Sequence, residues 1–429
     1  MKIKTLLVLS VITTLAMLLA FLGCNKSMSS SEDSDDIMDT PEKMIDAPRR
    51  DIVLTKAQET YVKAGNQFAY KWLKIVNDER KGSWFVSPMS FQFTLAMLAN
   101  GASDPALTDI CDVLGYGNDG IEVLDDYIKT LLSQLSDIDP NTESGIANMV
   151  LAAKGFPFTS EYKSKVSDIF NATAHEMSFS NLSAVADWVN KWTSDNTKGM
   201  INEAVSVDNL SDDLRSILGN TVYFKGKWVS RFHKRNTTDE VFTLENGTKK
   251  TILMMKQEGE FLCRQTSIYK QLTMPYGNGA YQMMVFLPLN SNTINSVIDN
   301  LQKEGTVFGE QNEADVWFPK FESETAKLSL KTHMTRLGMS VSSFLGLNYV
   351  GMQPSLIDGN ISEVLHTAKI KVDEVGSEAA GVTIVTNMTG AAPPSQKKVF
   401  EFHANRPFLY IISEVSTGAV LFAGKYDGQ

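Results

Sequence analysis

The chain has 429 residues, of which 43% are hydrophobic and 21% are charged, and its formal net charge is −10. This composition is typical of a globular protein and excludes a largely disordered chain, a collagen and a polytopic membrane protein. The acidic balance argues against an electrostatic nucleic-acid binder, and the 3 cysteines exclude a disulfide-dense scaffold.

The first segment has the pattern of an export signal. Two lysines precede the uncharged residues 5–22, a run that is long enough to span a membrane and that follows a short basic start. It ends at Gly23 and Cys24, which resemble the lipobox of bacterial lipoproteins, where the cysteine is acylated and becomes the new N-terminus. We therefore predict that residues 1–23 are a lipoprotein signal peptide and that Cys24 is lipidated. The alternative is a signal anchor with an incidental cysteine.

Lipidation would make the protein an exported one, held at the bacterial cell envelope and facing either the periplasm or the outside. The next residues, 24–52, contain few core-forming side chains, and the stretch 27–40 carries 5 acidic residues. Such a segment cannot bury enough apolar surface to offset the entropy that ordering would cost. We predict a flexible acidic tether over residues 24–52 and one folded domain over residues 53–429.

Helices are expected in the first part of that domain. Apolar residues recur at helical spacing from Leu54 to Val76, and a second helix begins near Ser87-Pro88 and ends at Asn100-Gly101. Helical patterns continue to about residue 135. Two later helices are expected over Ser183–Asn196 and Leu328–Leu337.

Strands are expected in the later part, where short apolar and β-branched runs alternate with turn residues. The expected strands are Ala147–Ala153, Ile217–Phe224, Lys270–Leu272, Gln282–Leu287, Ala314–Phe318, Ala368–Val372, Val382–Thr386, Phe408–Ser413 and Ala419–Phe422. Early helices and later strands favour the α+β class. No internal repeat or Pro/Gly-rich linker divides residues 55–427, which favours a single domain.

Motifs typical of enzymes are either absent from the sequence or lie outside the secondary-structure context that their function requires. Gly115, Gly117 and Gly120 match a dinucleotide fingerprint by letter, but they follow a helical pattern rather than a strand, so we predict a helix-ending turn. The sequence has no nucleophile elbow and no P-loop, and its 5 histidines and 3 cysteines lack metal-ligand spacing. We therefore expect no enzyme, no metal and no cofactor. Cys111 and Cys263 are expected to be free buried thiols, with a disulfide between them as the alternative.

Blocks of sequence, in order along the chain, resemble the serpins, a family of protease inhibitors. The most distinctive block runs from Asn220 to Trp228, and another runs from Trp84 through Ser87-Pro88 to Gly101. The other matching blocks are Ile146–Asn148, Lys154–Phe156, Met274–Tyr276, Met284–Pro288, Trp317–Phe321, Leu337–Met339, Glu374–Gly381, Phe402–Phe408 and Phe422–Lys425. The resemblance covers residues 55–427 and departs slightly at Met274, where many members have leucine, a swap that conserves volume.

The resemblance implies an α+β serpin fold with three β-sheets, about nine helices and an exposed reactive loop. It also implies roles for particular residues. Ser87, Ser90, Asn220 and His366 match the family's shutter, a polar cluster beneath the point where the main sheet opens. Trp228 and Lys320 match the breach, where the loop first enters the sheet. The hinge of the loop is matched by Glu374, Gly376, Ser377, Glu378, Ala379, Ala380 and Gly381. Each role has a purely structural alternative. His366 would be a hydrogen-bonded core histidine and Trp228 an ordinary core aromatic residue. Lys320 and Glu374 would form a surface ion pair.

The family's mechanism is suicide inhibition of serine proteases, with cysteine proteases as further candidates. A protease cuts the loop, and the cleaved loop inserts as a new strand in the main sheet. The family's spacing from Glu374 places the cut bond at Gly390–Ala391, whereas counting back from Pro407 leads to Pro393–Ser395. We prefer the count from the hinge because the length of inserted strand sets how far the protease is carried.

The neighbouring bonds Met388–Thr389 and Thr389–Gly390 stay open. Small residues around the cut favour elastase-like or subtilisin-like targets over trypsin-like ones. The expected partners are a target protease, bound covalently, and a membrane, through the lipid; we expect a monomer and no nucleic acid. The rival hypothesis is a non-inhibitory serpin that acts as a surface binding protein. Non-inhibitors tend to carry bulky, charged or proline residues at inward-facing hinge positions, and this hinge carries none there.

Overall fold

The computed structural model describes residues 44–117, 120–135, 137–210, 214–340, 364–377 and 399–429. Thr40–Gln429 forms one compact unit. The helices of the described residues are α1 (Lys56–Glu79), α2 (Pro88–Gly101), α3 (Ala106–Leu114), α4 (Ile121–Leu135), α5 (Ser160–Phe170), α6 (Leu182–Asn196), α7 (Ile294–Glu304) and α8 (Lys331–Leu337). No helix of this described part is long and apolar enough to cross a bilayer.

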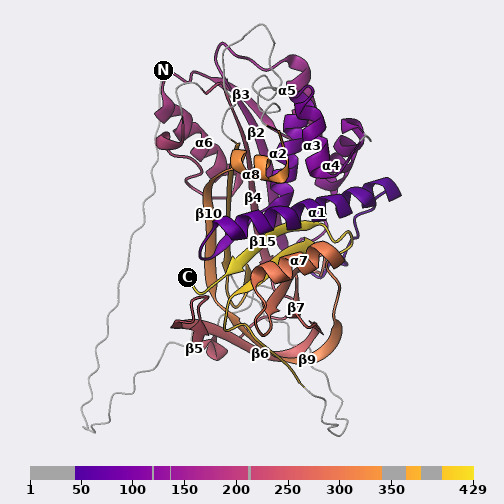
Figure 1. Cartoon of the computed structure of the whole chain (residues 1–429), viewed down its shortest axis with the longest axis vertical. Helices are drawn as coiled ribbons and strands as arrows, with labels where there is room; N and C mark the ends of the chain where they lie inside the picture. Colours follow the sequence, from indigo (N-terminus) through magenta and orange to yellow (C-terminus); the bar gives the residue numbers. More distant parts are fainter. Residues whose placement is uncertain (1–43, 118–119, 136, 211–213, 341–363, 378–398) are drawn as a thin grey trace, which may run out of the picture. The chain divides into compact units, whose positions relative to one another are not determined.

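Strands make up most of the rest (Figure 1). They are β1 (Trp84–Val86), β2 (Thr142–Ala153), β3 (Thr173–Met177), β4 (Ser216–Lys227), β5 (Thr238–Thr243), β6 (Lys249–Gln265), β7 (Tyr269–Tyr276), β8 (Tyr281–Pro288), β9 (Glu310–Pro319), β10 (Phe321–Ser329), β11 (Val364–Val372), β12 (Gly376–Ser377), β13 (Phe400–His403), β14 (Phe408–Glu414) and β15 (Val420–Tyr426). The α+β class expected from the sequence is confirmed.

The strands pair into two hydrogen-bonded networks among the described residues. One is a six-stranded sheet with the order β10-β11-β12-β4-β2-β3. The other has the order β1-β15-β14-β8-β7-β6-β9-β13, with β5 paired to β6. In that network β6 pairs with β9 over Met254–Cys263 but with β7 only over Leu262–Gln265. The long strand β6 therefore links the β9 and β7 parts of one nine-stranded network, so the pairing gives two sheets among the described residues where three were expected.

Local signals explain where the first two helices begin. The hydroxyl of Thr55 accepts a hydrogen bond from the backbone of Gln58, whose side chain accepts from the backbone of Thr55 in return, which closes a capping box before α1. At the start of α2 the hydroxyl of Ser87 caps the backbone of Ser90, and Pro88 occupies the first helical position, where no amide hydrogen is needed.

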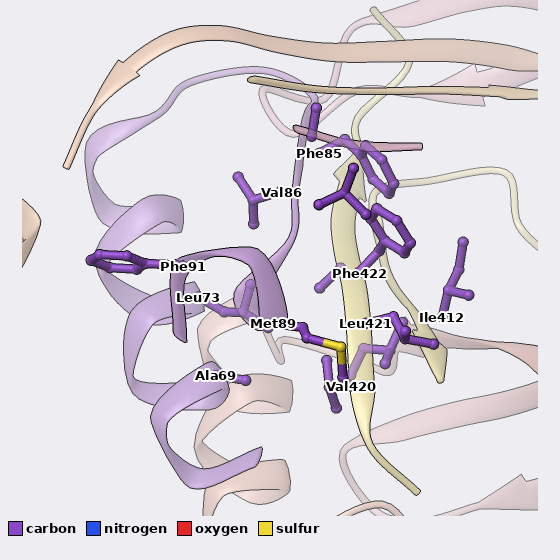
Figure 2. Close-up of a cluster of buried hydrophobic side chains, with 14 of the residues drawn as sticks. Ala69, Leu73, Phe85, Val86, Met89, Phe91, Ile412, Val420, Leu421 and Phe422 are labelled. Carbon is purple, nitrogen blue, oxygen red and sulfur yellow. The ribbon is translucent and has the colours of Figure 1, made fainter. Parts of the chain in front are cut away.

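The core lies on both sides of α2, which is buried from Pro88 to Ala99 because it packs against β15 on one side and against β4 and β11 on the other. Figure 2 shows Met89 of this helix close to Val420 and Leu421 of β15, with Ala69 and Leu73 of α1 nearby. A helix that is apolar on all sides is stable only when it is enclosed in this way. It places the N-terminus of α2 directly beneath the six-stranded sheet.

Several predicted elements differ from the structure at their ends. The helix expected from Leu328 begins at Lys331, because Leu328 pairs with His366 as part of β10. The longest strand, β6, was not predicted, since its middle is polar and carries no apolar run. The other expected strands in the described residues are present, and Val382–Thr386 lies outside those residues. The predicted turn after α3 is confirmed, with Gly115 in the left-handed region at φ 79°.

The C-terminal end of the expected tether, residues 44–52, lies against the folded body. The backbone of Ile45 donates to Asn141 Oδ1 (2.7 Å) and accepts from Asn141 Nδ2 (2.9 Å). The backbone of Ile52 donates to the hydroxyl of Ser416 (2.9 Å), and Met44 and Ile52 are buried. These contacts use mainly the backbone, which composition does not reveal.

Candidate functional site

The six-stranded sheet has a seam where β4 meets β11. At one end the two strands are direct parallel neighbours, with Leu218–Thr221 paired to Val364–Thr367. At the other end β12 lies between them, and Ser377 pairs with both Gly226 of β4 and Val372 of β11. Since neighbouring strands are about 4.8 Å apart, one end of the seam is about one strand wider than the other.

A tight turn delivers β12 into that position. The backbone amides of Val375 and Gly376 donate to the side chain of Asp373, and the backbone of Asp373 donates to the carbonyl of Gly376 (2.9 Å). This turn, which the side chain of Asp373 stabilises, reverses the chain directly after β11. A Cβ on Gly376 would lie 2.0 Å from the carbonyl oxygen of Gly226, so only glycine fits where the chain enters the sheet.

At the closed end of the seam, where β4 and β11 are direct neighbours, five polar side chains meet beneath the sheet. They form the central cluster, which consists of Ser87, Ser90, Asn148, Asn220 and His366. All five are buried, with exposed fractions of 1 to 5%. The last three come from β2, β4 and β11 and lie side by side, because Asn220 pairs with Asn148 on one side and with His366 on the other.

The hydrogen bonds of the central cluster run in one consistent direction. The backbone of Ser87 donates to His366 Nε2 (3.1 Å), so Nε2 is an acceptor and the proton of the neutral imidazole is assigned to Nδ1, which lies 3.5 Å from Ser90 Oγ. Ser90 Oγ donates to Asn220 Oδ1, and Asn220 Nδ2 donates to Asn148 Oδ1 (2.5 Å). Each group therefore acts as donor to the next.

Histidine 366 is neutral in this arrangement. Burial, and to a smaller extent the charges of His333 and Arg80, lower the pKa of His366 to about 3. A proton on Nε2 would also face the amide hydrogen of Ser87 and remove that hydrogen bond. The cluster is thus a set of uncharged, satisfied polar groups in an apolar surrounding.

At the wide end, a second group surrounds β12. This open-end cluster consists of Trp228, Tyr276, Lys320, Glu374 and Ser377. Trp228 stacks on Tyr276 with ring centroids 4.3 Å apart, and its Nε1 donates to the carbonyl of Asp373 (3.0 Å). The hydroxyl of Tyr276 hydrogen-bonds Ser377 Oγ (2.8 Å), so the aromatic pair forms the floor under β12.

An ion pair closes the same end. Lys320 Nζ lies 2.8 Å from Glu374 Oε2, and the hydroxyl of Thr237 donates to Glu374 Oε1 (2.8 Å). The Glu374 side chain is 5% exposed and that of Lys320 is 36% exposed. Burial alone would raise the pKa of Glu374, but the hydrogen bonds from Lys320, from its own backbone and from Thr237 outweigh burial and lower it. The carboxylate is therefore charged at neutral pH.

The structure thus brings the sequence-predicted shutter residues together in one place and the breach residues in another. Of the predicted hinge, Glu374, Gly376 and Ser377 are described. The remaining hinge residues Glu378, Ala379, Ala380 and Gly381, the proposed cut region Met388, Thr389, Gly390 and Ala391, and Cys24 lie outside the described residues.

Sequence reasoning missed Asn148 and Tyr276. Asn148 is a lone amide in the otherwise apolar run Ile146–Ala153, and that interruption was the available signal. Tyr276 stood in a matched block but was given no role, because its contact with Ser377 spans 101 positions of sequence. Cys111 and Cys263, left open by the sequence, are free and buried.

Comparison with known proteins covers nearly the whole chain. A family model described as Serpin (serine protease inhibitor) matches residues 63–427. A leukocyte elastase inhibitor from Xenopus laevis is 29% identical over 388 residues, which span 86% of this chain and 99% of the relative. An uncharacterized serpin-like protein from Thermococcus kodakarensis is 30% identical over 413 residues, with 92% and 91% covered. The crystal structure of tengpin, a thermophilic serpin in its native state, matches with a TM-score of 0.75 at 24% identity. The match covers 89% of this chain and 97% of tengpin, and it supports the fold alone.

Proposed function

Because the chain belongs to the serpin family, which is described as a family of serine protease inhibitors and not of enzymes, we propose that it is a suicide inhibitor of serine proteases. The protease serine would add to the carbonyl of the loop residue before the cut, and the amine after the cut would leave with a proton. The resulting ester is normally hydrolysed by water. Inhibition requires that the loop move into the seam before this hydrolysis occurs.

The observation that carries the proposal is the position of β12, between β4 and β11. Its register with each strand can be extended along the chain independently. From the pairing of Ser377 with Gly226, Thr383 would reach Asn220; from the pairing of Ser377 with Val372, the same Thr383 would reach His366. Asn220 and His366 are already paired with each other across the closed seam. An inserted strand would therefore be in register with both neighbours at once.

The two faces of that strand follow from the faces of β4. Leu218, Val222 and Phe224 belong to the main core, whereas Ile217 packs in the cluster beneath α6. Cross-strand partners share a face, so Ser377, Ala379, Gly381 and Thr383 would face the core, and Glu378 would face the side of α6. Ser377, at 1% exposed, already lies on that core side. The core-facing set is small, as entry between packed strands requires.

The central cluster suits the exchange of one strand for another. The bond between Ser90 and His366 is its longest, at 3.5 Å, and it crosses the seam beneath the position that Thr383 would take. A hydroxyl arriving between Asn220 and His366 provides one donor and two acceptor sites. The buried groups would then keep partners after the strands separate, which is what their role as a shutter demands.

Insertion would also carry the protease. From Gly226 to Ser216 the seam offers about ten residue steps, or roughly 33 Å of travel. Each new ladder hydrogen bond contributes about 0.5–1.5 kcal/mol net, so the inserted segment gains on the order of 10 kcal/mol. A protease tethered by its ester to the end of that segment would be pulled against the far end of the body, which would distort its active site.

We further propose a cut at Gly390–Ala391, with Met388–Thr389 and Thr389–Gly390 as alternatives, and an elastase-like or subtilisin-like target. The small residues at these positions support this specificity, as does the name of the Xenopus relative, a leukocyte elastase inhibitor. Incubation with pancreatic elastase, subtilisin and trypsin should give an SDS-stable complex with one of the first two. N-terminal sequencing of the released C-terminal fragment then identifies the bond.

The rival, a non-inhibitory serpin that binds partners at the surface, predicts a different result of that experiment. Such a protein is cleaved by all three proteases without any SDS-stable complex. The small core-facing residues of the proposed inserted strand favour inhibition over this rival.

We also propose export and lipidation at Cys24, supported by the lipobox-like Gly23-Cys24 after an apolar run. Cys24→Ala should abolish acylation and move the protein out of the membrane fraction. If Cys24→Ala has the same lipid mass and the same membrane fraction as the wild type, the proposal of lipidation at Cys24 is wrong.

A further inference from the structure

A second buried histidine lies close to the central cluster, and no role has been assigned to it. His333 of α8 is 1% exposed, and its two ring nitrogens have different partners. Trp72 Nε1 of α1 donates to His333 Nδ1 (2.8 Å), while His333 Nε2 lies 2.6 Å from Glu79 Oε2. An acceptor at Nδ1 and a carboxylate at Nε2 define a neutral imidazole with its proton on Nε2.

Trp72 connects this histidine to the seam. Its indole, which is fully buried, packs edge-on against His366, with ring centroids 5.6 Å apart and an angle of 83° between the planes. The orientation of a buried indole is set by where its single N–H finds an acceptor. His333 therefore determines how Trp72 is held, and Trp72 forms one wall of the site that holds His366.

The same residues tie one half of the sheet to α1. Strand β10 leads directly into α8, and the backbone of Leu330, just before α8, donates to Val364 at the start of β11 (3.1 Å). Arg336 of α8 pairs with Glu79 of α1, which also accepts from His333. The β10–β11 side of the seam is thus anchored to α1 through His333 and its neighbours, whereas β4 is held through Asn220.

We propose that His333 is a positioning residue of the seam: through Trp72 it fixes the ring of His366, and its protonation releases this hold. A proton on Nδ1 would face the N–H of Trp72, so two donors would meet where one hydrogen bond stood. The hydrogen bond to Glu79 would remain. Protonation of His333 therefore removes its contact toward the seam, through Trp72, while it strengthens its contact with Glu79.

The groups around His333 keep it neutral at neutral pH. Glu79 and Arg80 face it from α1, Arg336 faces it from its own helix, and His366 faces it from β11. Burial lowers the pKa of His333; the hydrogen bond and charge of Glu79 oppose this, and the charges of Arg336 and Arg80 add to it. Acidification is therefore needed to charge the ring, and the hold on Trp72 should weaken as the pH falls.

Three variants of the full mature chain separate the two hydrogen bonds of His333. His333→Asn keeps an acceptor near the position of Nδ1, and His333→Gln keeps a donor near the position of Nε2. Trp72→Phe removes the indole N–H and serves to assign its NMR signal. The first readout is the ¹⁵N–¹H signal of the Trp72 indole, followed from about pH 7.5 down to the lowest pH at which the chain stays folded. We expect it to titrate in the wild type and to be independent of pH in His333→Asn.

The second readout is amide hydrogen exchange at Val364–Thr367, which lie at the closed end of the seam. We expect His333→Gln and Trp72→Phe to raise exchange about tenfold at neutral pH, and His333→Asn to stay within about threefold of the wild type. Equal exchange in the Asn and Gln variants, or an indole signal that does not move with pH in the wild type, would overturn the proposal. If His333→Gln does not fold, Trp72→Phe alone decides the exchange result.

The consequence for inhibition rests on the proposed function. A loosened His366 should let the uncut chain lose its ability to form an SDS-stable complex faster on storage, by about the same factor as the change in exchange. Neither the NMR signal nor the exchange rate requires a protease. Failure of the inhibitory function would therefore leave those two tests intact, and failure of the tests would leave inhibition intact.

Discussion

The two ends of the seam are held by different chemistry. The central cluster is buried and uncharged, and its hydrogen bonds join side chains of three strands to Ser90 of α2 and to the backbone of Ser87, which precedes that helix. The open-end cluster combines a stacked aromatic pair with an ion pair in which Lys320 is 36% exposed, and one strand is already seated there. Uncharged hydrogen bonds in a dry core can be exchanged for equivalent ones without separating charge. The contrast suggests that the closed end is built to be opened and the open end to hold the arriving chain.

The largest expected effect comes from cutting the loop. Cleavage within residues 384–392 should raise the melting temperature by about 20–30 °C, because a gain on the order of 10 kcal/mol moves a domain of this size by a few degrees per kcal/mol. Thermal melts of intact and nicked protein check this. If the two melt together, the closed end does not open and the contrast between the ends has no functional meaning.

Arginine at the open end should come next. Ser377→Arg places a long charged side chain on the core side against Tyr276, and Ala379→Arg does so one step further along the proposed register. We expect the stoichiometry of inhibition to rise at least about tenfold. Slow insertion would allow water to hydrolyse the ester between protease and loop first, so the protein would be cleaved as a substrate. Glu378→Arg, on the opposite face, is the matched control and should be much milder. Equal effects at all three positions would refute the alternating faces.

At the closed end, Asn220→Ala removes the acceptor for Ser90 and the donor to Asn148. We expect a loss of about 2–4 kcal/mol in the free energy of unfolding, since each buried partner left unsatisfied costs about 1–3 kcal/mol. Urea denaturation measures it. Asn312→Ala, a partly exposed strand position, is the control and should stay within about 0.5 kcal/mol of the wild type. A loss no greater than that of the control would mean that the cluster is not fully formed.

The smallest effect distinguishes the two ends by pH. The pKa of His366 is about 3 when folded and near 6.5 when unfolded, so the unfolded chain binds more protons between these values and stability falls as the pH falls. Lowering the pH from 6.5 to 5 should cost up to about 2 kcal/mol through His366, and His333 acts in the same direction. His366→Gln should reduce this slope.

The open end should respond at lower pH. The folded pKa of Glu374 lies below its ordinary value, so its contribution is complete above about 4.5 and is lost only as the pH falls through the folded pKa. Glu374→Gln should therefore leave the slope between pH 5 and pH 6.5 unchanged. A change in that slope would show that the two ends are electrostatically coupled.

Much of this protein was predictable from the sequence, because some of its signals are local. Ser87-Pro88 predicted the start of α2, since a capping hydroxyl and a proline act within one turn of helix. The apolar runs of β4, β8 and β14 predicted buried strands. The ordered serpin-like blocks indicated the family, and with it which residues to compare across the sheet.

Other features depended on contacts between residues far apart in the chain. The polar middle of β6 forms a strand because β9 supplies hydrogen bonds to it, and Leu328 belongs to a strand because His366 lies opposite. The directions of the hydrogen bonds at Asn148, the floor that Tyr276 forms under Ser377, and the link from His333 through Trp72 to His366 join positions 72 to 294 residues apart. Sequence determines which groups are present and how each segment folds locally. Only the packed structure decides which donor meets which acceptor, because register and burial are properties of the whole sheet.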